Sequence, residues 1–136
     1  MKDEKLTIYL ASTYKEFGYR RNTRLKYSQY ANIIDPIGCL TEEECNKIFG
    51  EHTYEWIVRR DKKLILSSDI LVAYIDSYGI TPGTTMEIIF SFENGIPTYL
   101  IDTKQKYIND YWLKFHTKKI FKSVDECFSE ILNLKV

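Results

Sequence analysis

The chain has 136 residues, a length typical of one folded domain, so we expect a single domain over residues 1–136. Its 19 basic and 19 acidic residues give a formal net charge of zero, which argues against polymeric nucleic acid or an anionic membrane surface as partners. Hydrophobic residues make up 44% of the chain and charged residues 28%, values that argue against a disordered chain.

The cysteine and histidine content gives no sign of a disulfide framework or a zinc site. The three cysteines lack CxxC spacing, and the two histidines stand far apart in the sequence. The charged N-terminus leads directly into a short apolar segment, without the long apolar region of a signal peptide or a membrane span. We therefore expect a cytoplasmic protein with reduced thiols.

The first half of the chain predicts two strands and two helices. The short apolar run 6–11 is typical of a strand buried on both faces. The polar-rich stretch 15–29 predicts a helix, and residues 31–36 predict a weaker strand that ends at a proline. A second helix is expected over 53–66, where apolar residues recur on one face.

The second half continues the alternation. Residues 69–75 and 97–101 repeat the buried-strand pattern, and the segment between them predicts a helix over 84–94 that ends at an Asn-Gly pair. Residues 119–121 are just long enough for a fifth strand. The stretch 124–134 predicts a last helix, preceded by a serine in a capping box.

Strands that alternate with helices of this length predict an α/β fold. We expect an open, doubly wound, parallel five-stranded sheet of flavodoxin or Rossmann type, with helices on both faces. In such sheets ligands bind outside the carboxyl ends of the strands, near the point where the strand order reverses. The candidate loops are therefore those that follow Ala11, Asp35, Ile75 and Ile101.

The loop after residue 75 leads to the first candidate catalytic residue, Glu87. Thr84 or Thr85 can cap the helix that follows, so its first amides would face the pocket. Glu87 would then lie near the positive end of the helix dipole, where its ionised form is favoured. Such a carboxylate can act as a nucleophile or a base, but a stabilising surface charge has the same pattern.

Asp61 is the second candidate, eight residues before Asp69 at the start of a predicted strand. It lies within the run Arg-Arg-Asp-Lys-Lys, which is also typical of a solvated helix face. The chain contains neither a phosphate-binding P-loop nor a GxGxxG motif, so the two commonest nucleotide-binding patterns of this fold class are not indicated.

Together these segments resemble a known family. The segment Ile-Tyr-Leu-Ala-Ser at 8–12, the pair Asp61 and Asp69, and the segment Gly-Thr-Thr-Met-Glu at 83–87 are similar to the nucleoside 2-deoxyribosyltransferase family. That family includes the related 2-deoxynucleoside 5-monophosphate N-hydrolases. The resemblance spans residues 6–109 in the same order and with closely similar spacings.

The resemblance implies a role for each matching residue. Glu87 matches the nucleophile that attacks C1′ of the deoxyribose and forms a covalent glycosyl-enzyme. Tyr9 matches a tyrosine that holds this carboxylate in place, and Asp61 matches an aspartate that helps to transfer a proton to the departing base. Asn109 resembles an asparagine that reaches the sugar 5′-hydroxyl in the site of a neighbouring subunit. Two carboxyl groups in different environments can divide the nucleophilic and acidic tasks, with the raised pKa expected at Asp61.

The substrate class is left open between nucleosides and 5′-monophosphates. Thr81 stands where the transferases carry an aspartate and the hydrolases tend to carry a serine, which favours a nucleotide. Asn109 favours a free nucleoside. The arginines of the first predicted helix could bind a phosphate or form an exposed basic face; they are Arg20, Arg21 and Arg24.

We expect a transferase acting at the N-glycosidic bond, with a hydrolase of 5′-monophosphates and a non-catalytic nucleotide-binding sensor as alternatives. The expected substrate-binding residues lie at the strand ends and in the loop before Glu87; they are Ser12, Tyr14, Asp35, Ile37, Thr81, Gly83 and Asn109. The resemblance implies no metal or organic cofactor. It also implies a homodimer or higher homo-oligomer, for which the aromatic segment 107–115 is the candidate interface.

Overall fold

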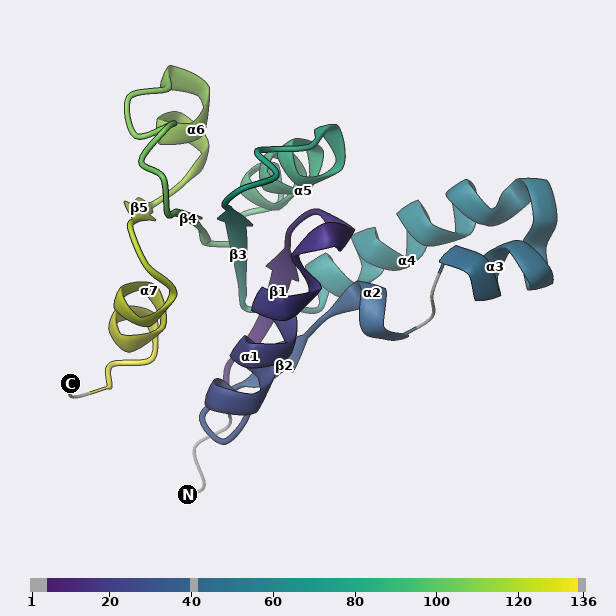
Figure 1. The fold of residues 1–136 in the computed structure, drawn as a ribbon, viewed down its shortest axis with the longest axis horizontal. Coiled ribbons are helices and arrows are strands. Elements are labelled where there is room, and N and C mark those ends of the chain that lie inside the picture. Colours follow the sequence, from purple (N-terminus) through teal and green to yellow (C-terminus); the bar gives the residue numbers. More distant parts are fainter. Residues whose placement is uncertain (1–4, 40–41, 135–136) are drawn as a thin grey trace.

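The computed structural model describes residues 5–39 and 42–134, and a parallel five-stranded sheet runs through its centre (Figure 1). The strands lie in the order β2-β1-β3-β4-β5, so the strand order reverses between β1 and β3. The expected open, doubly wound α/β sheet is therefore confirmed. The strands are β1 (Thr7–Ala11), β2 (Asn32–Ile34), β3 (Ile70–Ile75), β4 (Thr98–Asp102) and β5 (Lys119–Phe121).

The register of the central strands brings their carboxyl ends to a common edge. Tyr9 of β1 lies beside Ile34 of β2 and Leu71 of β3, and Ala11 lies beside Ala73. Both β1 and β3 are buried almost throughout because helices cover both faces of the sheet. The loops that follow β1, β2 and β3 consequently meet at the switch in strand order.

Two layers of helices enclose the sheet. One hydrophobic cluster joins Ile8 and Leu10 of β1 to α1 and α7; the other joins Tyr9 and Ala11 to α4, α5 and α6. The helix α3 packs against α4 and extends with it to one side of the sheet (Figure 1). The helices are α1 (Phe17–Tyr27), α2 (Pro36–Cys39), α3 (Glu42–Phe49), α4 (Thr53–Leu66), α5 (Pro82–Glu93), α6 (Tyr111–His116) and α7 (Val124–Ile131), with short 3₁₀ turns η1 (Tyr14–Glu16) and η2 (Gly50–His52).

Local sequence signals set the ends of α5 and α7. The helix α5 begins one residue after Thr81, whose side chain accepts a hydrogen bond from the amide of Thr84, so the expected cap at Thr84 or Thr85 is wrong. The proline that follows Thr81 suits the first helical position because it needs no amide donor there. Gly95 follows the C-terminal end with φ of +74°, as the Asn-Gly pair predicts. Ser123 caps α7 through the amide of Glu126.

Four short elements, α2, α3, η2 and α6, were not expected from the sequence. Each of these elements is too short to carry a long amphipathic repeat, which is the main helix signal in a sequence. In α6 the aromatic side chains of Tyr111 and Trp112 are also exposed, so they do not mark a buried face. Within the described residues, no helix is both long enough and apolar enough to span a bilayer.

Candidate active site

Three side chains from three separate elements meet on the face of the sheet that α4, α5 and α6 cover. Tyr9 lies in the middle of β1 and is fully buried. Its hydroxyl donates a hydrogen bond to Oε2 of Glu87 on α5. Asp61 on α4 lies close enough for its charge to raise the pKa of both groups. The structure therefore brings together the three residues to which the family resemblance assigns catalysis.

The environment of Glu87 disfavours its ionised form. Burial raises the pKa of Glu87 to about 8; the hydrogen bond from Tyr9 opposes this rise, the charge of Asp61 adds to it, and the charge of Arg60 opposes it. The expectation that the helix dipole keeps Glu87 ionised is therefore wrong. Glu87 is the sixth residue of α5, beyond the first turn, where the dipole has faded and the loss of water dominates.

Asp61 forms an ion pair with the residue before it. Arg60 Nε lies 3.0 Å from Asp61 Oδ1, and the two side chains are 14% and 22% exposed. Burial raises the pKa of Asp61, while the charge and the hydrogen bond of Arg60 lower it. The raised pKa that was expected for Asp61 is thus found. The predicted solvated charge run is only partly solvated, because Arg60 lies over the ring of Trp56, 5.1 Å from its centroid.

The hydroxyl of Tyr9 remains a hydrogen-bond donor at every pH of interest. Burial raises the pKa of Tyr9 far above its usual range, and the charges of Glu87 and Asp61 raise it further. The neutral phenol of Tyr9 can donate a hydrogen bond to the Glu87 carboxyl whether that carboxyl is protonated or ionised. The hydrogen bond is stronger when the carboxyl is ionised. Tyr9 therefore fixes the position of Glu87 from the floor of the site.

A buried arginine organises the neighbouring strand ends. Arg20 of α1 is 2% exposed, and its Nε lies 3.0 Å from Oδ1 of Asp35 at the end of β2. The same guanidinium donates to Ser12 Oγ and to the backbone carbonyls of the two following residues. Asp35 also accepts the amide of Ile37. Arg20 thus ties the loop after β1 to the end of β2, and these contacts leave it buried rather than presented to a phosphate.

The remaining expected substrate-binding residues lie at the same edge of the sheet. Thr81 and Gly83 form the N-terminal end of α5, Tyr14 begins η1, and Asn109 lies in the loop between β4 and α6. Tyr14 is 65% exposed, and Asn109 is also exposed. Among the described residues, no hydrogen bond joins these four to Tyr9, Asp61 or Glu87, so the four residues lie at the same edge of the sheet without bonding to that group.

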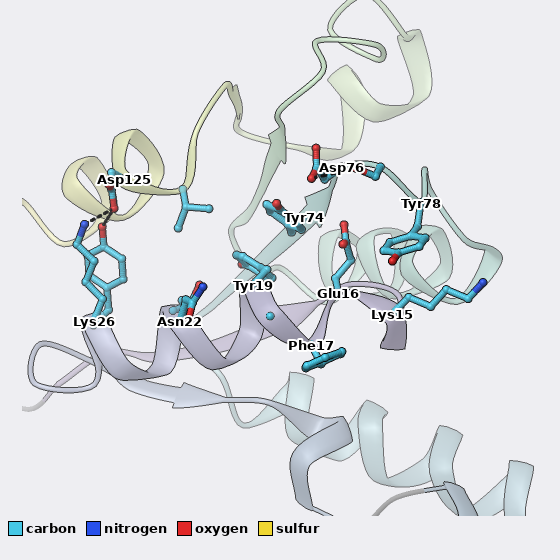
Figure 2. A pocket seen from close by; sticks show the side chains of 15 residues that line it. Lys15, Glu16, Phe17, Tyr19, Asn22, Lys26, Tyr74, Asp76, Tyr78 and Asp125 are labelled. Carbon is cyan, nitrogen blue, oxygen red and sulfur yellow. Dashed lines mark hydrogen bonds and ion pairs between the residues drawn. The ribbon is translucent and has the colours of Figure 1, made fainter.

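A groove of about 600 Å³ lies elsewhere, between α1 and α7 on the opposite face of the sheet (Figure 2). Glu16 and Tyr19 line it, and burial together with the charge of Asp76 raises the pKa of Glu16. Oε2 of Glu16 and the hydroxyl of Tyr19 are buried in the wall and have almost no accessible surface. A molecule in the groove would not reach them, and we do not assign the reaction to this groove.

The arrangement around Glu87 is suited to acid and nucleophilic chemistry. Two carboxyls that influence each other share protons as a pair, so one can be ionised while the other carries a proton. Within residues 5–39 and 42–134, no group of three His, Cys, Asp or Glu side chains gathers as a metal site would require. The chemistry that these residues can perform is proton transfer and attack by a carboxylate.

Sequence reasoning missed two arginines that shape the site. The sequence pattern is typical of a solvated charge run at Arg60, and at Arg20 it leaves open a phosphate ligand or an exposed basic face. The spacing of Trp56 and Arg60, four residues apart on one helix, could have indicated that the guanidinium packs on the indole. The burial of Arg20 had no signal in the sequence, because it depends on Asp35, which follows the strand β2.

The fold is shared with solved enzymes. The chain superposes with a 2-deoxyribosyltransferase of Bacillus psychrosaccharolyticus with a TM-score of 0.74 at 19% identity, covering 89% of each chain. A 2-deoxyribosyltransferase of Leishmania mexicana gives a TM-score of 0.58 at 18% identity, covering 98% of this chain and 100% of the other. The CMP N-glycosidase of Clostridium botulinum gives 0.57 at 15% identity, covering 92% and 96%.

At these identities the likeness establishes a common fold, which agrees with the fold that the resemblance implies. No protein-family model matches the chain, and no curated protein matches it in sequence.

Proposed function

We propose that this protein is an enzyme of the nucleoside 2-deoxyribosyltransferase family that cleaves an N-glycosidic bond through a covalent intermediate on Glu87. The observation that carries the proposal is the hydrogen bond from the buried Tyr9 to Glu87, with the carboxyl of Asp61 beside them. Shared fold with two deoxyribosyltransferases and one N-glycosidase supports the same reaction class.

The first step is the attack of an ionised Glu87 oxygen on C1′ of the sugar. The bond between C1′ and the base nitrogen breaks, its electron pair stays with the base, and the proton of the Asp61 carboxyl neutralises it. The transition state resembles an oxocarbenium ion, so the carboxylate of Glu87 stabilises its positive charge. The products are a glycosyl ester on Glu87, a neutral base and an ionised Asp61.

The second step decides between transfer and hydrolysis. The nitrogen of a second base, or a water molecule, attacks C1′ while Asp61 accepts its proton. The ester bond to Glu87 breaks, and both carboxyls return to their starting states. We favour transfer to a second base. Hydrolysis of a 5′-monophosphate is the alternative. It is supported by Thr81, whose hydroxyl lies at the N-terminal end of α5, where a phosphate would be stabilised.

Substrate binding is proposed at the edge of the sheet. Ser12 and Asp35, held by Arg20, would bound the base pocket together with Ile37, and the exposed ring of Tyr14 could cover the base. Thr81 and Gly83 would contact the sugar or phosphate side, since they open the helix that carries Glu87. The substrate is thus a small nucleoside or nucleotide.

We further propose that the protein is a homodimer or higher homo-oligomer. The side chains of Tyr111, Trp112 and Phe115 on α6 are 85%, 74% and 67% exposed, an apolar surface that a second copy would cover. Asn109 stands exposed beside this surface, where it could enter the site of a neighbouring subunit, as the family resemblance implies. The free, buried thiols of Cys45 and Cys127 are compatible with the cytoplasmic location that we propose.

The test is a panel of deoxynucleosides, ribonucleosides and their 5′-monophosphates, each incubated with and without an acceptor base. Chromatography would measure released base and any new nucleoside. Glu87→Ala should abolish base release, and Glu93→Ala, which changes an exposed glutamate on the same helix, should not. Mass spectrometry of the protein quenched during turnover should find the sugar on the peptide that contains Glu87.

Two results would overturn the proposal. Base release that persists in folded Glu87→Ala would exclude Glu87 as the nucleophile. Binding of a nucleotide, seen as a rise in melting temperature, without any base release across the panel would favour the non-catalytic sensor.

A further inference from the structure

We infer that Arg60 is a positioning residue of this site: its guanidinium, held on the ring of Trp56, fixes one oxygen of Asp61 and supplies a positive charge beside the carboxyls of Asp61 and Glu87. The inference rests on the proposed function for its catalytic consequence. Its electrostatic part can be measured on the protein alone.

The contacts of Arg60 hold it in one place. Its Nε donates to Oδ1 of Asp61 at 3.0 Å, and its guanidinium lies 5.1 Å from the centroid of the Trp56 ring. The ring of Trp56 is itself stacked on Phe49 of α3, with centroids 4.9 Å apart. At 14% exposure the Arg60 side chain has lost most of its water, so its charge is screened less than that of a surface arginine.

The charge of Arg60 acts on every titratable group of the proposed site. It lowers the pKa of Asp61 on α4, of Glu87 on α5 and of Tyr9 on β1. The like charges of Asp61 and Glu87 act in the opposite direction. Lys62 is the neighbouring cation of α4 that contacts α5, and its ammonium lies over the ring of Phe90.

The position of Arg60 next to Asp61 has a mechanistic consequence. By binding Oδ1 it leaves Oδ2 of Asp61 to carry and deliver the proton, so that the orientation of the acid is set before substrate binds. Lysine could replace the charge, but it lacks the planar group that stacks on Trp56 while donating to a carboxylate. Charge and geometry are therefore separable by substitution.

The test compares Arg60→Gln and Arg60→Lys with the wild type, and Arg59→Gln, an exposed neighbour, is the matched control. Carboxyl carbon NMR would follow the titration of Glu87 and Asp61 without substrate. In Arg60→Gln the Glu87 titration should move upward by about one pH unit, because an opposite charge at close range shifts a carboxyl by about that much. Arg60→Lys should titrate nearly as the wild type.

The pH profile of kcat/KM supplies the second readout. Arg60→Gln should move its acid limb upward by about one pH unit, because the charge of Arg60 lowers the pKa of both Glu87 and Asp61 and its loss raises both. Arg60→Lys should keep the limb in place but lower the plateau, since the acid is less well oriented. Trp56→Leu, which removes the platform and keeps the arginine, should lower the plateau in the same way.

The inference fails if the Glu87 titration is unchanged in folded Arg60→Gln. It also fails if activity falls equally in Arg60→Gln and the Arg59→Gln control. Should Arg60→Gln not fold, an unchanged plateau in Trp56→Leu would overturn the positioning role. Absence of base release by the wild type would contradict the proposed function instead, and the NMR titration would still decide whether Arg60 supplies the charge.

Discussion

The raised pKa of Glu87 predicts that this residue destabilises the folded protein at alkaline pH. The pKa lies at about 8 in the folded protein against an ordinary value of 4.5. The folded state therefore holds the Glu87 proton more tightly than the unfolded chain does. This contribution to stability is fully present below pH 4.5 and is lost as pH rises through about 8.

The substitution Glu87→Gln should remove this pH dependence, because an amide has nearly the same shape and does not ionise. At about 1.4 kcal/mol for each pKa unit, the variant should be more stable than the wild type at pH 9 by at most about 5 kcal/mol. For a chain of this length about 1 kcal/mol moves the melting temperature by 3–4 °C, so the gain should be at most about 15 to 20 °C. Near pH 4.5 the two proteins should melt together.

The assay is thermal unfolding followed by circular dichroism in buffers from pH 4.5 to pH 9. Glu93→Gln on the same helix is the control, since Glu93 is exposed and should leave the wild-type curve unchanged. If Glu87→Gln loses stability in parallel with the wild type between pH 5 and pH 9, the carboxyl does not resist ionisation and the account of its environment is wrong.

Three further substitutions test other contacts. Tyr9→Phe removes a hydrogen bond that lowers the pKa of Glu87. The acid limb of the kcat/KM profile should therefore move to higher pH, and activity at pH 7 should fall about ten- to hundredfold. An acid limb that stays in place would contradict this role of Tyr9. Arg20→Met leaves the buried Asp35 without its closest cation and should cost about 3 kcal/mol in urea unfolding, whereas Arg21→Met, at an exposed position, should cost almost nothing. Trp112→Glu should give a smaller species than the wild type in light scattering, with the exposed Tyr54→Glu as control; equal masses would refute the α6 interface.

The sheet could be predicted from the sequence because its central strands are buried on both faces. A run such as residues 70–75 is apolar throughout, and such runs separated by helix-length segments leave few topologies. The short helices could not be predicted in the same way. In α6, Tyr111 and Trp112 are exposed aromatic side chains, so hydrophobicity there does not report burial in the core of one chain.

That the three candidate residues lie near one another was predictable, but their electrostatics were not. The family resemblance named Tyr9, Asp61 and Glu87 from short segments, and the fold brings these residues together. The protonation of Glu87 depends on how completely β1, α4 and α5 exclude water, which no local pattern encodes. The pKa of Glu87 therefore shifts in the direction opposite to the one that the helix dipole alone predicts, since the dipole is a local stabilisation and burial competes with it.

The cost of ionising Glu87 has a direct relation to the proposed reaction. A carboxylate that has lost its water and lies beside another carboxyl is poorly stabilised in the folded protein, as the raised pKa expresses. When positive charge develops at C1′ of a bound sugar, that carbon provides the stabilisation that water no longer gives. Only the transition state receives this benefit, because a neutral ground-state sugar has no such charge. The stability that Glu87→Gln gains at pH 9 therefore measures the cost of holding Glu87 ionised in the folded protein. Arg60 reduces the cost of ionising Glu87, but it also reduces the stabilisation that an ionised Glu87 gives to the charge at C1′. The charge of Arg60 must therefore balance the fraction of Glu87 that is ionised against the reactivity of the ionised carboxylate.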